Sequence, residues 1–199
     1  MDGAATGSRP HLFKVADYHR MTDAGLFDET PRVELIQGQI IDMAAIGSPH
    51  FGMVNRLTRL LVPLVGARGL VSVQNPVRLD PGSEPQPDVA ILKPRADDYE
   101  TGAPGPSDVL LLIEVADTSL DFDRGVKAPL YAQSGIAEYW IVNLPERLIE
   151  VHREPAGARY AQVRRAKSGN ALDILMLPGA NLPATDLLYG NAGCGALPR

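Results

Sequence analysis

Three carboxylates in this sequence interrupt apolar segments. Asp88 opens the segment 88–92, Glu114 lies near the end of the run 109–115, and Glu34 breaks a third apolar stretch. The run around Glu114 is typical of a strand buried on both faces, where an ionised carboxylate requires a cation, hydrogen-bond donors or a raised pKa. The alternatives are that Asp88 is a turn residue and that Glu114 reaches water at a strand end.

These residue types suit one particular chemistry. If the strands of Asp88 and Glu114 are neighbours, their carboxylates can meet at one end of a sheet, where they repel unless a cation lies between them. Oxygen ligands of this kind suit Mg²⁺ or Mn²⁺. Lys127, in the next predicted helix, could orient water or stabilise charge on a phosphoryl group, although most lysines are simply solvated. Together these parts predict metal-assisted phosphodiester hydrolysis.

The bulk composition fits one globular domain. The chain has 199 residues, of which 45% are hydrophobic and 22% are charged. Its formal net charge of -5 provides no global positive field for nucleic acid. The single cysteine, Cys194, excludes an intramolecular disulfide and favours a reducing compartment. No signal-peptide core and no membrane-spanning run is visible, so we expect a soluble cytoplasmic protein.

Hydrophobic periodicity predicts the elements that must position these groups. The first half of the chain predicts a helix over 15–24, a β-hairpin over 33–43 and an amphipathic helix over 49–66. Ser48 is expected to cap the amphipathic helix, and Pro63 to kink or end it.

The second half of the chain is richer in strands. A helix is predicted at 120–134, between the apolar strands 109–115 and 138–143. This order reads as a crossover unit with two parallel strands. Further strands are predicted at 70–73, 77–79, 88–92, 148–152, 160–165 and 172–177. The sequence therefore predicts an α/β fold, a mixed sheet with a helix on each side.

An ordered set of short motifs resembles one known family. The segments are ELIQGQI, SPH, QPDVAIL, LLIEVADTS, DFDRGVKAPLY and GIAEYWIVN. They resemble the restriction endonuclease family called Uma-two, within the PD-(D/E)XK nuclease superfamily. The resemblance covers residues 12–189 and implies a restriction-endonuclease-like mixed β-sheet flanked by helices. Residues 1–11 are then expected to be a disordered tail, and 190–199 a flexible one.

The resemblance also implies roles for individual residues. Asp88 matches the PD aspartate and Glu114 the acidic residue of the second half-motif, so both would ligate Mg²⁺ or Mn²⁺. The superfamily's lysine position is occupied by Ala116, and Lys127 on the following helix matches the place of the missing amine. Glu34 matches the family's hairpin glutamate and would be a third acidic group; the alternative is a salt bridge with a hairpin neighbour such as Arg32.

The implied activity is that of a magnesium-dependent endonuclease acting on nucleic acid, DNA in particular. Two alternatives stay open, a catalytically silent binding module with the same fold and a hydrolase of small phosphoesters. His50 and Gln74 are secondary candidates for the site. Tyr139, Trp140 or the late hairpin could form a homodimer interface. A basic cluster is a candidate phosphate-contact strip, or only solvated strand charge; its members are Arg147, Arg153, Arg159, Arg164, Arg165 and Lys167.

Overall fold

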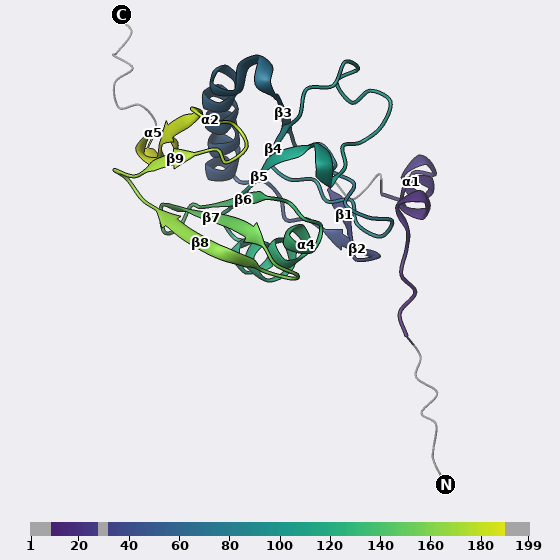
Figure 1. Ribbon diagram of the computed structural model, residues 1–199. Coiled ribbons are helices and arrows are strands. Elements are labelled where there is room, and N and C mark those ends of the chain that lie inside the picture. The colour runs from purple at the N-terminus through teal and green to yellow at the C-terminus, as the bar shows by residue number, and fades with distance from the viewer. Residues whose placement is uncertain (1–8, 28–31, 190–199) are drawn as a thin grey trace, which may run out of the picture.

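The fold is described from a computed structural model of the chain, which covers residues 9–27 and 32–189 (Figure 1). All of the expected tail 190–199, and most of the expected tail 1–11, lie outside the described residues. In the part that is described, no helix is both long and apolar enough to cross a membrane.

A six-stranded mixed sheet forms the centre of the fold, with strand order β3-β4-β5-β6-β7-β8. All neighbours are antiparallel except β5 and β6, which are parallel as the crossover unit requires. The strand bounds are β3 Leu70–Val73, β4 Val89–Leu92, β5 Val109–Ala116, β6 Glu138–Asn143, β7 Leu148–Pro155 and β8 Tyr160–Ala166. β4 and β5 are adjacent, as is required for the carboxylates of Asp88 and Glu114 to meet at one end of the sheet.

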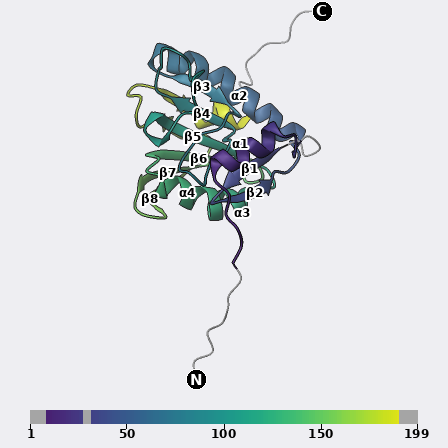
Figure 2. The same ribbon diagram turned by 90° about the vertical axis from the view of Figure 1, so that its right-hand side faces the viewer.

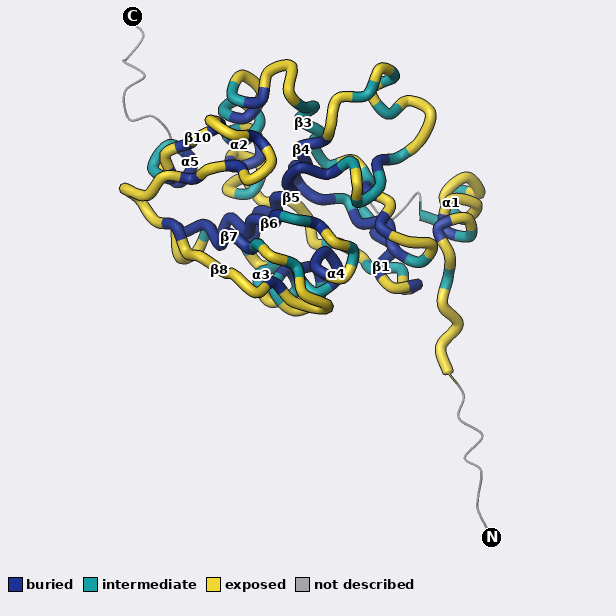
Figure 3. The backbone as a smooth tube through the Cα atoms, viewed as in Figure 1, coloured by how far each residue is buried: buried dark blue, intermediate teal, exposed yellow. Residues whose placement is uncertain are grey.

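Strand β5 is buried along its whole length, which explains its unbroken apolar character. Leu111 and Ile113 join the core beneath α2 (Ser48–Val65), whereas Leu112 and Ala116 join the core beneath α4 (Ala128–Gln133). The two helices lie on opposite sides of the sheet in Figure 1. Figure 3 shows β5 and β6 as the buried interior and β8 as a largely exposed edge. The expected fold class, a restriction-endonuclease-like mixed sheet flanked by helices, is confirmed.

The first part of the chain forms α1 (Val15–Asp23) and the hairpin β1–β2 (Val33–Ile36 and Gln39–Asp42). Gln37 and Gly38 have φ values of 50° and 77°, as a two-residue hairpin turn with two left-handed positions requires. Glycine is needed at position 38, since a Cβ there would lie 2.6 Å from the Cβ of Leu12. In Figure 2 the hairpin lies between α2 and α3 (Leu120–Phe122), in front of the sheet.

Three predictions in the middle of the chain differ from the structure. Gly47, and not Ser48, caps α2, and Pro63 does not end the helix, which continues to Val65. Pro63 has no N–H to give to the carbonyl of Arg59, so the helix lacks that one hydrogen bond just before it ends. Residues 77–79 form no strand, because their amides donate to loop carbonyls, as Val77 does to Pro85.

The predicted helix 120–134 has the right limits but a different interior. Between α3 and α4 lies a π-helical turn, Asp123–Lys127, in which the amide of Ala128 donates to the carbonyl of Asp123. Pro129 follows at once and has no N–H to give to the carbonyl four residues earlier. The wider turn accommodates this proline without breaking the helix.

The C-terminal part completes the core under α2. The predicted strand 172–177 is reduced to β9 (Ala171–Asp173), which pairs with β10 (Asn181–Pro183) ahead of α5 (Ala184–Tyr189). Tyr139 and Trp140 are completely buried in the core of the chain. The expectation that they form a dimer interface is therefore wrong, and they are core aromatics.

Candidate active site

A cavity of about 240 Å³ opens where β4 begins and β5 ends. All four residues proposed from the sequence line it, namely Glu34, Asp88, Glu114 and Lys127. Its rim is formed by segment 43–47 and by residues 117–119 ahead of α3. Residues more than ninety positions apart are thus brought to one place by the hairpin, the sheet and the crossover helix.

Asp88 is held by three hydrogen bonds. Its Oδ2 accepts from His50 Nε2 and from the amide of Val115, each at 2.9 Å, and its Oδ1 accepts from Gln74 Nε2 at 3.2 Å. The β4–β5 register pairs Val89 with Ile113, which continues to Asp88 opposite Glu114. Burial acts to raise the pKa of Asp88, but these donors outweigh it and leave the pKa below its ordinary value.

Two of the three donors were secondary candidates in the sequence. His50 lies in the first turn of α2, after Pro49, and lines the cavity. Gln74 follows β3 in the left-handed region, with a φ of 53°, which turns the chain next to Asp88. The Nδ1 of His50 is buried and has no hydrogen-bond partner among the described residues. The side chains of His50 and Gln74 therefore orient the carboxylate of Asp88.

Glu114 is buried on the α4 side of β5 and is only 4% exposed. Its Oε1 accepts from Lys127 Nζ at 2.9 Å and from the Tyr131 hydroxyl at 2.8 Å. Burial raises the pKa of Glu114 well above its ordinary value, and nearby carboxylates add to the effect, whereas Lys127 opposes it. Both protein donors fall on one oxygen, which leaves Oε2 for another partner.

Lys127 is buried, with 1% of its side chain exposed, so it is not a solvated helix residue. Its Nζ lies 2.9 Å from Glu114 Oε1 and 3.2 Å from Glu34 Oε2. Burial acts to lower the pKa of Lys127, but Glu114, Glu34 and Asp123 raise it above its ordinary value. Glu34 therefore pairs with Lys127, and its Oε2 accepts no hydrogen bond from the described residues.

Asp123 and Tyr131 belong to the same cluster, although neither was expected there from the sequence. Asp123 lines the cavity, is 2% exposed and accepts a hydrogen bond from Ser119 Oγ at 2.6 Å. Burial raises the pKa of Asp123. Asp123, Lys127 and Tyr131 are spaced four residues apart, which in a helix places them on one face; this spacing could have indicated that they lie together.

The π-helical turn keeps these three side chains aligned. In an α-helix, four residues rotate the chain by about 40° more than one full turn. In a π-helix, whose hydrogen bonds run from i to i+5, four residues rotate it by about 30° less than one full turn. The step from Asp123 to Lys127 is of the second kind, and the step from Lys127 to Tyr131 is of the first. The two deviations nearly cancel, so all three residues face the end of β5.

The donor chemistry of the cavity fits a hard divalent cation. Asp88 uses three of about four lone-pair directions, and Glu114 has one oxygen without a protein donor. Glu34 Oε2 accepts no hydrogen bond from the described residues but lies 3.2 Å from Lys127 Nζ, so Asp88 and Glu114 are the two acids left to hold the ion. Within residues 9–27 and 32–189, no three acidic, histidine or cysteine side chains form a ready-made metal cage.

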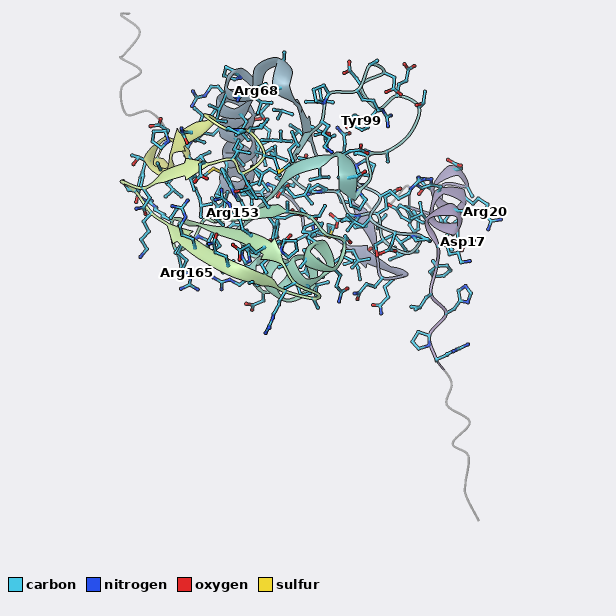
Figure 4. The ribbon with its side chains drawn as sticks, in the orientation of Figure 1. Asp17, Arg20, Arg68, Tyr99, Arg153 and Arg165 are labelled. Atoms are coloured by element: carbon cyan, nitrogen blue, oxygen red, sulfur yellow. The ribbon has the colours of Figure 1, made fainter. Side chains whose placement is uncertain are left out.

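Three of the six residues of the basic cluster, namely Arg153, Arg164 and Arg165, form ion pairs. Arg153 lies 2.6 Å from the buried carboxylate of Glu138, and Arg165 lies 3.3 Å from that of Glu150. Figure 4 shows both arginines on the β7–β8 side of the sheet. These pairs favour a structural role for Arg153 and Arg165.

The fold has a counterpart among solved structures. A solved structure from Anabaena variabilis ATCC 29413, described as "a putative nuclease belonging to DUF820", superposes with a TM-score of 0.60. The two chains are 14% identical, and the match covers 79% of this chain and 90% of the other. At this identity the likeness establishes the fold.

The family is given by the sequence itself. Residues 15–185 match the Uma2 family, the Uma-two family named above, whose description is "Putative restriction endonuclease". The chain belongs to this family, and the resemblance seen in the sequence is confirmed. Comparison with curated proteins gives no match.

Proposed function

We propose that this protein is a divalent-metal-dependent nuclease that hydrolyses phosphodiester bonds in nucleic acid, DNA in particular, in the cytoplasm. The observation that carries the proposal is the convergence of Asp88, Glu114, Glu34 and Lys127 in one cavity. Family membership supports the same reaction class.

In this proposal Asp88 and Glu114 hold Mg²⁺ or Mn²⁺. The bound ion would activate water and neutralise charge on the phosphoryl oxygens. His50, Gln74 and the amide of Val115 keep Asp88 ionised and oriented. A carboxylate so restrained needs little rearrangement to act as a ligand.

Lys127 and Tyr131 fix Glu114 from the other side. Their two hydrogen bonds hold Oε1, so that Oε2 is presented to the cavity. Glu34 in turn holds the ammonium of Lys127, 3.2 Å away. Lys127 is then placed to stabilise negative charge that develops next to Glu114.

The charge of the cavity lining supports the need for a metal. Besides His50, only Arg32 and Lys127 are basic among the lining residues, and they face five carboxyl groups, those of Glu34, Asp88, Glu114, Asp117 and Asp123. A phosphodiester entering this lining would be repelled unless cations were present.

The test is cleavage of plasmid and oligonucleotide DNA with Mg²⁺ or Mn²⁺. Asp88→Asn and Glu114→Gln should each lower the rate at least about a hundredfold, since each removes a charged ligand of the proposed site. Glu100→Gln, at an exposed loop position, is the matched control and should keep the wild-type rate. Equal rates in all four proteins would refute the proposal. Preferential turnover of a dinucleotide over long DNA would instead support the alternative of a small-phosphoester hydrolase.

A second candidate is a binding module without turnover. It is favoured by the ammonium of Lys127, which already lies between Glu114 and Glu34 as a cation. Calorimetric titration with Mg²⁺ distinguishes the two. Binding that is lost in Glu114→Gln supports the nuclease, and no binding supports the silent module.

A homodimer remains part of the proposal, now limited to the late hairpin. Strand β8 is an edge of the sheet, and Val163 on it is 51% exposed. An unpaired edge of this kind can pair with a second copy. Sedimentation of the wild type and of Val163→Lys would test this, since a dimer through β8 should dissociate in the variant.

A further inference from the structure

The reacting groups of the proposed nuclease lie at the bottom of a narrow space. Asp88 and Glu114 are each 4% exposed, and Lys127 is 1% exposed. The cavity volume of about 240 Å³ is below the roughly 300–1,000 Å³ of small-molecule pockets. A phosphodiester in a stiff duplex, whose persistence length is about 50 nm, cannot be bent into such a space without opening the duplex. A single strand can enter it one unit at a time.

The cavity also offers little attraction for a phosphate backbone. Lys127 is already engaged by two carboxylates, so Arg32 is the remaining strongly basic side chain in the lining. Duplex binding depends mainly on phosphate neutralisation by several basic side chains. Affinity here must therefore have a different main source, and base stacking on aromatic side chains is the common one for single strands.

An exposed aromatic side chain lies one residue from the cavity lining in the chain. Phe51 is 61% exposed in the first turn of α2, directly after the cavity residue His50. Side chains on a helix lean toward its N-terminus, which places Phe51 toward segment 43–47 of the rim. Ile46 in that segment lines the cavity and is 40% exposed. The amide of Phe51 donates to Gly47 at 3.0 Å, which fixes the helix start against the rim.

We propose that Phe51 and Ile46 form a platform on which a base of single-stranded nucleic acid stacks, so that the neighbouring phosphodiester enters the cavity. The substrate class is then a single strand, or the unpaired part of a flap or loop. This inference rests on the proposed function for its cleavage step, but the binding it describes needs no cleavage.

The test measures binding to the full wild-type chain by fluorescence anisotropy, with Ca²⁺ in place of Mg²⁺ so that a cation is supplied while cleavage is suppressed. The probes are a labelled 20-nucleotide single strand, as DNA and as RNA, and the duplex of the same sequence. We expect the single strand to bind at least about tenfold more tightly than the duplex, and Phe51→Ala to weaken it about 5- to 150-fold. Val62→Ala, which shortens another exposed apolar residue of α2, is the control and should leave binding unchanged.

A second readout reports stacking directly. Trp140, the one native tryptophan, is buried in the core, so a Phe51→Trp variant adds an emission signal at the rim. Stacking predicts that single strands quench this added emission and that the duplex does not. Equal or tighter duplex binding, no binding of any probe, or equal effects of Phe51→Ala and Val62→Ala would overturn the inference. Phe51-dependent binding, together with no cleavage by the wild-type protein in Mg²⁺ or Mn²⁺, would overturn only the nuclease.

Discussion

The buried triad of Lys127, Glu34 and Glu114 gives a sharp stability prediction. Lys127→Met keeps most of the side-chain volume but removes the ammonium that lies 2.9 and 3.2 Å from the two carboxylates. The carboxylates must then remain charged without a partner or take up protons. At pH 7, protonating one carboxyl with a pKa of about 4.3 costs about 3.7 kcal/mol, so two protons set a limit of about 7 kcal/mol. Breaking a buried ion pair typically costs about 3–5 kcal/mol, which is our expected loss.

The pH dependence of this loss follows from the same reasoning. In Lys127→Met the folded-state pKa of Glu114 rises further above its unfolded value, because the ammonium that opposed the effect of burial is gone. Stability from a raised carboxyl pKa is present at low pH and is lost as pH rises through the folded pKa. Between pH 7 and pH 6 the stability of the variant should therefore rise relative to that of the wild type. The rise is up to about 1.4 kcal/mol for each proton that the folded variant binds in excess of the folded wild type. The wild type has part of this slope already, because burial raises the pKa of Glu114.

Urea unfolding at pH 7 and pH 6 measures these quantities. The double variant Lys127→Met/Glu114→Gln has one buried carboxylate fewer and should regain more than half of the lost stability. A loss below about 1 kcal/mol at pH 7, or one that does not shrink on acidification, would refute the view that the ammonium balances the carboxylates.

Three further predictions concern single contacts. Tyr131→Phe removes one donor to buried Glu114 and should lower the free energy of unfolding by about 1.5–3 kcal/mol, measured in urea; a change below about 0.5 kcal/mol would show that Lys127 alone is sufficient. Gly38→Ala should cost more than Gly157→Ala, because both positions have positive φ but only position 38 places the new Cβ 2.6 Å from Leu12; equal thermal shifts would contradict this. Burial lowers the pKa of His152 from its ordinary 6.5, so below about pH 6.5 the unfolded state binds more protons than the folded state and the free energy of unfolding falls. His152→Gln should reduce this fall, measured by urea unfolding between pH 7 and pH 5. An unchanged slope of stability against pH in the variant would contradict the prediction.

The sheet was largely predictable because its strands carry their own signal. The run 109–115 is apolar on both faces because β5 is covered by α2 and α4. Segment 77–79 has the same local character, yet its amides bond to loop carbonyls. Its apolar residues are buried without pairing in the sheet, and a short apolar run cannot distinguish these outcomes.

The grouping of the candidate site residues in one cavity was predictable where apolar context made a charge conspicuous. Asp88, Glu114 and Glu34 stood out for this reason, whereas Tyr131 looked like an ordinary core aromatic. Its hydroxyl acquires a role only through a partner on β5, which is a tertiary contact. The π-helical turn was missed because it depends on how the chain adapts to Pro129, and hydrophobic periodicity does not report single-residue changes in winding.

The same π-helical turn makes one part of the protein easier to open than its surroundings. A π-helical turn is a rare interruption of an α-helix, and Gly125 at its middle adds backbone freedom. Amide exchange over 123–128 should therefore be faster than in α4, which packs on the sheet. Each such opening would withdraw Lys127 from its two carboxylates, leaving the pocket briefly at its most negative, which is the state a divalent ion would meet on entry.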